Sequence, residues 1–83
     1  MIYGVYSIRD EASGLFTGIQ LSECNDVAIR NFDYALKSND LMRFKPEDFS
    51  LYYLGDYDNV SGHIEVKDSM ILKRGVKRNG GKN

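Results

Sequence analysis

The chain has 83 residues, enough for a single domain. It is 42% hydrophobic and 28% charged, with 11 Lys and Arg against 12 Asp and Glu, which excludes a wholly disordered chain. One cysteine and one histidine exclude a disulfide framework, a thiolate zinc cluster and a multi-histidine metal site. No apolar run approaches the ~20 residues that span a bilayer, and no signal peptide opens the sequence, so we expect a soluble intracellular domain.

The first predicted elements form a β-hairpin. Residues 2–9 are rich in β-branched and aromatic side chains and predict a strand. Residues 10–14 have the composition of a turn, and residues 15–21 predict a second short strand. An antiparallel pairing of the two strands is the simplest connection, and Gly18 indicates a bulge or bend in the second strand.

A helix is predicted over residues 25–38. Asn25 is the expected N-cap, and Asp33 with Lys37 forms an (i, i+4) pair that favours a helix. The apolar positions of this segment recur at helical spacing and form one stripe: Ala28, Ile29, Phe32, Ala35 and Leu36.

The second half of the chain predicts two more strands. Residues 41–48 form a connector because Pro46 disfavours helix at the preceding residue. Residues 49–54 predict a strand. After a loop over 55–62, residues 63–67 alternate apolar and polar side chains, which predicts a half-exposed strand with its apolar residues inward: Ile64 and Val66. Residues 70–72 either extend the sheet or pack on the body.

The element order is β-β-α-β-β, which predicts an α+β fold: an antiparallel sheet with one helix packed on one face. We expect one domain over residues 1–68 and a basic, flexible C-terminal tail over 69–83. The sheet face without a helix either stays open or meets a second copy of the chain. A homodimer is expected, because so short a chain buries only about 60% of its surface on its own.

The near-zero net charge of −1 conceals a split along the chain. Residues 1–68 hold all 12 acidic side chains and six basic ones, a net of −6, whereas residues 69–83 hold five basic side chains and no acid. A short basic segment can neutralise phosphates and release their counterions. The tail is therefore either a solubilising segment or a contact for nucleic acid or an acidic protein surface.

No catalytic constellation is present in the sequence. Cys24 and His63 belong to different predicted elements, and nothing local links them as a nucleophile and base. The acidic loop at 55–62 lacks the spacing of a calcium-binding loop and is interpreted as a solvated turn or a weak cation site. We therefore expect no enzyme, no cofactor and no dedicated metal site.

Aromatic residues are frequent in the predicted strands, Tyr52 and Tyr53 among them. Proteins that bind single strands stack bases on such side chains, although strand aromatics also serve core and interface packing.

Three stretches in order resemble the small non-structural protein of gokushovirus-type microviruses, which are bacteriophages with single-stranded DNA. Residues 5–10 read VYSIRD, residues 28–32 read AIRNF, and residues 46–58 read PEDFSLYYLGDYD. The similarity covers residues 2 to about 65. It implies a non-enzymatic protein of the host bacterial cytoplasm that is absent from the mature capsid and binds DNA during replication or packaging of the genome.

This resemblance supplies no catalytic residues. The candidate DNA-binding residues are Lys73, Arg74, Lys77, Arg78 and Lys82 of the tail, with Arg9, Arg30, Arg43, Lys45, Tyr52 and Tyr53. The alternative is a homodimeric module that binds viral or host replication or packaging proteins without contacting DNA.

Overall fold

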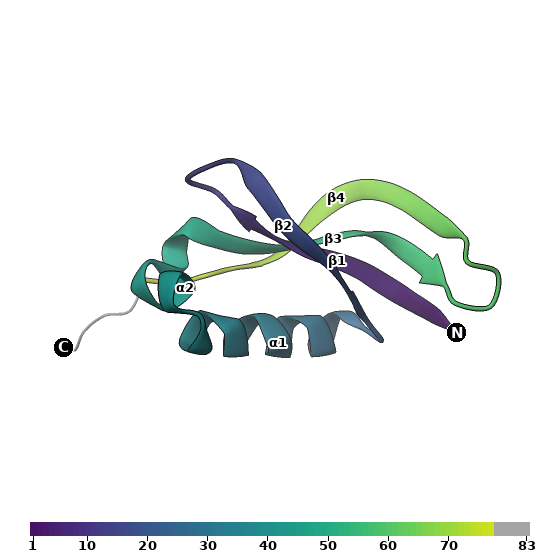
Figure 1. Cartoon of the computed structure of the whole chain (residues 1–83), viewed down its shortest axis with the longest axis horizontal. Coiled ribbons are helices and arrows are strands. Elements are labelled where there is room, and N and C mark those ends of the chain that lie inside the picture. Colours follow the sequence, from purple (N-terminus) through teal and green to yellow (C-terminus); the bar gives the residue numbers. More distant parts are fainter. Residues whose placement is uncertain (78–83) are drawn as a thin grey trace.

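The computed structural model describes residues 1–77 and places one long helix against one face of a four-stranded antiparallel sheet (Figure 1). The strand order is β2-β1-β3-β4. The elements in chain order are β1 (Ile2–Asp10), β2 (Leu15–Ser22), α1 (Asn25–Ser38), α2 (Asp40–Phe44), the 3-10 turn η1 (Pro46–Asp48), β3 (Phe49–Asp58) and β4 (Ile64–Arg74). This arrangement confirms the predicted α+β fold and its β-β-α-β-β order.

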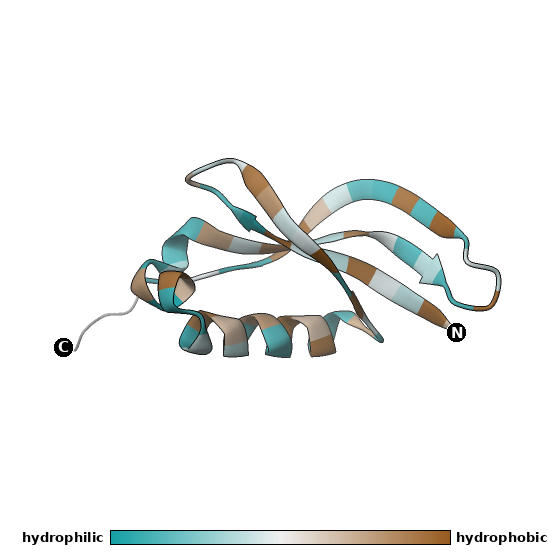
Figure 2. Ribbon diagram, in the orientation of Figure 1, coloured by the Kyte–Doolittle hydropathy of each residue, from teal (hydrophilic) through white to brown (hydrophobic). Residues whose placement is uncertain are grey.

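The core lies between α1 and the sheet. Burial of the apolar stripe of α1 holds the helix on the sheet. Phe32 is the most enclosed apolar residue, with 1% of its surface exposed. Its cluster of buried residues comes from the helices and the two central strands: Tyr6, Ile8, Ala28, Met42, Phe49 and Leu51. Apolar positions also run along β2 and β4, outside this core (Figure 2).

The predicted hairpin and its bulge are confirmed. Ser7 pairs with Ile19 and Arg9 pairs with Phe16, so two residues of β2 oppose one residue of β1. Gly18 is one of the two. The Ser7 hydroxyl donates to the carbonyl oxygen of Thr17 at 3.0 Å, which satisfies a backbone group that the bulge removes from the ladder.

Two predicted contacts of α1 are wrong, although its bounds at 25 and 38 are confirmed. The N-cap is Cys24, and the side-chain oxygen of Asn25 instead accepts a hydrogen bond from the Tyr6 hydroxyl at 2.7 Å. Asp33 pairs with the Lys73 ammonium at 2.8 Å rather than with Lys37, because β4 lies beside this face of the helix.

The segment predicted as a connector contains two short helical elements. The Asn39 side chain caps α2 by accepting a hydrogen bond from the Met42 amide at 3.1 Å. Pro46 opens η1, where its missing N–H costs no helical hydrogen bond. The connector therefore turns tightly under the end of α1 and returns the chain to the sheet.

The last two strands are longer than expected. β3 continues to Asp58, and β4 continues to Arg74, so residues 69–74 of the expected tail pair with β3 as part of the sheet. The prediction that Ile64 and Val66 face inward is wrong. Their exposed fractions are 60% and 84%, because they point to the side of the sheet that α1 does not cover.

Gly75 fixes the end of β4 to η1. Its N–H donates to the Phe49 carbonyl oxygen at 2.8 Å, and a Cβ atom at this position would overlap the Pro46 carbonyl oxygen. Gly75→Ala is therefore expected to lower the free energy of unfolding by about 1–3 kcal/mol, measured by urea denaturation. Gly18→Ala is the matched control, because a Cβ there meets no atom within 4 Å. Equal effects of the two substitutions would contradict this account.

Candidate nucleic-acid interface

One end of the molecule gathers basic side chains around a groove. The groove lies where α2 and η1 meet the segment after β4, and Gly75 brings that segment into place. Its walls are Arg43, Phe44, Lys45, Pro46, Glu47 and Lys77. Phe44 is 79% exposed, so an aromatic side chain stands beside three cations and one acidic residue, Glu47.

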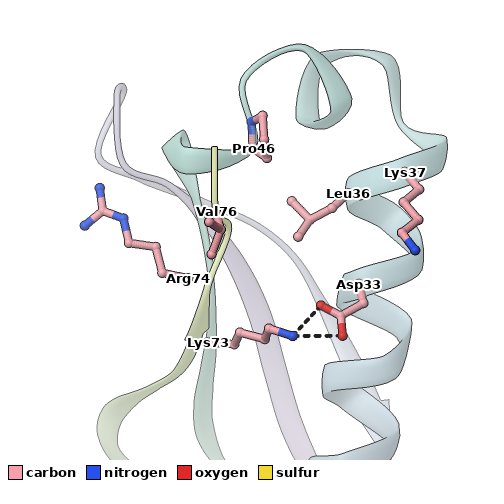
Figure 3. A pocket seen from close by; sticks show the side chains of 7 residues that line it. All are labelled: Asp33, Leu36, Lys37, Pro46, Lys73, Arg74 and Val76. Atoms are coloured by element: carbon pink, nitrogen blue, oxygen red, sulfur yellow. Dashed lines mark hydrogen bonds and ion pairs between the residues drawn. The ribbon is translucent and has the colours of Figure 1, made fainter. Parts of the chain in front are cut away.

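A second hollow adjoins this groove on the α1 side (Figure 3). Lys73 points towards α1 and holds Asp33 in an ion pair, so its charge is compensated locally. Arg74 points to the other side of β4, where its Nε donates to the Glu47 carbonyl oxygen at 3.2 Å. Lys37 and Val76 complete the rim, together with Leu36 and Pro46.

We call five cationic residues the basic end: Lys37, Arg43, Lys45, Arg74 and Lys77. Within residues 1–77, the one ion pair in this set joins Arg43 to Asp40 at 3.7 Å, and both side chains are largely exposed. Such a pair contributes little and is easily exchanged for another anion. The basic end is therefore suited to bind phosphate groups, with a nearby ring for a base to stack on.

The structure brings together four of the predicted residues at this end: Arg43, Lys45, Arg74 and Lys77. Lys73 borders it but is paired with Asp33. Arg30 is exposed on α1, where it contacts Asn31. Two further predicted residues, Arg78 and Lys82, lie outside the described residues.

Two other predicted residues, Arg9 and Tyr52, meet on the sheet face opposite α1. Arg9 pairs with Glu11 at 2.6 Å, and the Tyr52 hydroxyl donates to the same carboxylate at 3.1 Å. Phe16 packs edge-on to Tyr52 at 5.3 Å and lies under the Arg9 guanidinium. These groups satisfy one another, so the cluster is closed to a ligand in this arrangement.

Tyr53 lies on the α1 side of the sheet, beside a group of carboxylates that we call the acidic region: Asp56, Asp58 and Glu65. Its hydroxyl donates to Asp56 at 2.5 Å, and Lys67 pairs with the same carboxylate at 2.9 Å. The hydrogen bond from Tyr53, and then the contact with Lys67, lower the pKa of Asp56. Contact with Asp56 in turn raises the pKa values of Tyr53 and Lys67.

The acidic region ends in the turn between β3 and β4. The Asp58 side chain accepts a hydrogen bond from the Val60 amide at 2.9 Å, and this bond lowers the pKa of Asp58. A shallow hollow beside it is lined by Ile2, Asp56, Asp58, His63 and Glu65. This region belongs to the end of the sheet that carries the N-terminus, whereas α2 and the basic end lie at the opposite end (Figure 1).

Phe44 and Lys37 are the two residues of the site that the sequence analysis did not select. The signal for Phe44 is its position between Arg43 and Lys45, which places an aromatic inside a basic run. The sequence predicts that Lys37 pairs with Asp33. In the structure Lys73 pairs with Asp33 instead, and Lys37 lines the second hollow.

Neither a membrane helix nor a metal site emerges from residues 1–77. No helix there has the length and apolar character that crossing a bilayer requires. In the same part of the chain, no group of three or more His, Cys, Asp or Glu side chains is arranged to hold a metal ion.

A comparison with protein-family models matches residues 3–77 to a family described as "Phage ORF5 protein". Searches of curated proteins and of solved structures gave no match.

Proposed function

The chain belongs to the Phage ORF5 protein family and is thus a bacteriophage protein, and we propose that its basic end binds single-stranded DNA. The observation that carries this proposal is the groove in which Arg43, Lys45 and Lys77 surround an exposed Phe44. We further propose that the phage is a gokushovirus-type microvirus and that binding serves replication or packaging of its single-stranded genome.

Electrostatics supports this assignment of the site. The chain as a whole carries a net charge of −1, so its overall field does not attract a polyanion. The basic end gathers five cations around two adjoining hollows that also contain two acidic residues, Glu47 and the Asp33 that Lys73 neutralises, and the acidic region lies at the other end of the molecule. A phosphate backbone is therefore attracted locally, and repulsion from the acidic region favours a short contact rather than coating along the whole surface.

The exposed aromatic supports a single strand rather than a duplex. Bases of a single strand are free to stack on a protein ring, at about 1–3 kcal/mol per base, whereas bases of a duplex are already stacked. Exposure of a phenylalanine ring to water has an unfavourable free energy, which stacking on a base would relieve. Tyr34 is a second exposed ring on α1, but it lies outside both hollows.

Binding of a fluorescent single-stranded oligonucleotide of about 16 nucleotides tests the proposal. Fluorescence anisotropy at low salt is expected to give a micromolar or weaker dissociation constant for the full chain, with weaker binding to a duplex of the same sequence. Phe44→Ala is expected to weaken single-strand binding about tenfold and duplex binding much less.

Leu41→Ala is the matched control, because Leu41 is an exposed apolar residue of the same short helix that does not line the groove. No binding of the full chain at low salt would refute the proposal. Equal losses for Phe44→Ala and Leu41→Ala would refute the role of the ring.

A further inference from the structure

The sheet face opposite α1, called the open face here, presents aliphatic side chains on its two outer strands. Paired residues of neighbouring strands share a face. Tyr6 faces α1, so the preceding residue Val5 faces the open side of the sheet. Its partners on the neighbouring strands, Leu21 on β2 and Gly55 on β3, therefore lie on the open face as well. The same pairing assigns exposed apolar residues of β2 and β4 to the open face: Phe16, Ile19, Leu21, Ile64, Val66 and Ile71.

The centre of the open face holds small and large residues of the two central strands. The small ones are nearly inaccessible: Val5, Ser7, Ser50 and Gly55. The large ones on the same face are half-buried: Tyr3, Arg9, Tyr52 and Tyr57. The exposed apolar residues lie on the outer strands β2 and β4, on either side of this centre. A two-fold rotation can place these apolar residues against those of an identical molecule.

The size of the open face matches the needs of a dimer. Four strands spaced ~4.8 Å apart and about nine residues long give a flat area of roughly 570 Å². Projecting side chains raise the accessible area towards the ~800 Å² per partner of a standard interface. Residues 1–77 contain eight buried apolar residues, a small core, so burial of a second apolar surface adds substantially to stability.

The charges that the strand pairing assigns to the open face are already engaged. Residues 15–22 contain no charged side chain. Two cations share this face because they pair with Ser50: Arg9 is ion-paired with Glu11, and Arg74 donates to the Glu47 carbonyl oxygen. The exposed apolar residues of β2 and β4 carry no charge, so two copies of the chain meet there without like-charge repulsion.

We propose that the open face is the interface of an isologous homodimer, in which the exposed apolar residues of β2 and β4 of one protomer pack against those of the other. The two sheets then stack face to face at about 10 Å, and α1 of each protomer lies on the outside. The groove lined by Arg43, Phe44 and Lys77 is not part of the open face and remains accessible on each protomer. This proposal does not rest on DNA binding.

Sedimentation equilibrium of the full chain across micromolar concentrations tests the dimer. The full chain is expected to reach twice its monomer mass of 9.5 kDa. Val66→Asp is expected to raise the dimer dissociation constant at least tenfold, because it buries a charge in an apolar interface. Val60→Asp is the matched control: both valines are 84% exposed, but Val60 lies in the turn between β3 and β4.

Circular dichroism checks that each variant is folded, and Ile19→Asp on β2 provides a second test of the same face. A monomeric full chain would overturn the proposal. A dimer that survives both Val66→Asp and Ile19→Asp, or one that Val60→Asp disrupts equally, would overturn it as well. If the unmodified chain is monomeric and Val66→Asp abolishes its binding of the oligonucleotide, the open face binds nucleic acid instead.

Discussion

Phe32→Ala is expected to remove most of the stability of the protein. Phe32 comes from the centre of α1, is 1% exposed and packs in the main apolar cluster. Truncation of a buried phenylalanine costs about 3–5 kcal/mol, because the transfer free energy is lost and a cavity remains. A domain of this length has a free energy of unfolding of roughly 4–12 kcal/mol, so a large fraction of it would disappear.

Urea denaturation followed by circular dichroism at one fixed protein concentration measures this effect, since association would make stability depend on concentration. Tyr34→Ala is the control on the same helix, because Tyr34 is 72% exposed. It is expected to change the free energy of unfolding by less than about 0.5 kcal/mol. A loss below about 1 kcal/mol for Phe32→Ala would contradict the packing of α1 on the sheet.

The triple substitution Arg43→Gln, Lys45→Gln and Lys77→Gln is expected to weaken single-strand binding about 10- to 100-fold. All three side chains line the same groove and none belongs to the apolar core. Each exposed contact with a phosphate is assigned about 0.5–1 kcal/mol, and three such contacts give this range. Fluorescence anisotropy with the same oligonucleotide at constant salt measures the loss.

Lys67→Gln is the control for removal of a cation outside the basic end. Lys67 pairs with Asp56 in the acidic region and lies outside the basic end. This substitution is expected to change the dissociation constant for the oligonucleotide by less than about twofold, because salt screens an isolated surface charge that lies far from the site. Binding that falls equally with Lys67→Gln would indicate a general effect of net charge rather than a site.

A chain that ends at Lys77 separates the contribution of the last residues from that of the folded groove. Truncation after Asp68, which the expected tail boundary suggests, would delete residues 69–74 from β4 and remove contacts with β3. A cut after Lys77 leaves the sheet and the groove complete. It tests Arg78 and Lys82 alone.

The sequence correctly predicted those parts of the fold that a single local pattern of residues specifies. The stripe from Ala28 to Leu36 identified the helix, which spans the expected residues 25 to 38 although its N-cap is Cys24. The hairpin and the bulge at Gly18 followed from turn composition and a glycine within a strand. The ends of β3 and β4 were missed, because bulges after Leu51 and Tyr53 shift the register and interrupt the alternation that marks a strand.

The candidate site was predicted in its chemistry but not in its geometry. Basic residues from 43 to 45 and from 73 to 77 were selected by charge, and the fold brings them to one end. Which cation is neutralised depends on long-range packing: the partner of Asp33 is 40 positions away at Lys73, not one turn away at Lys37. The inward orientation expected for Val66 failed because alternation tells which residues share a face and not which face is covered.

The salt dependence of oligonucleotide binding tests the central claim most directly. For single strands, the logarithm of the association constant falls with the logarithm of salt concentration by about 0.7 per phosphate contacted. If the basic end is the site, the slope for the Arg43, Lys45 and Lys77 triple variant is shallower than that of the unmodified chain by about 2, and the slope for Lys67→Gln is unchanged. Parallel slopes for the unmodified chain and the triple variant would contradict the claim that these residues contact the phosphates.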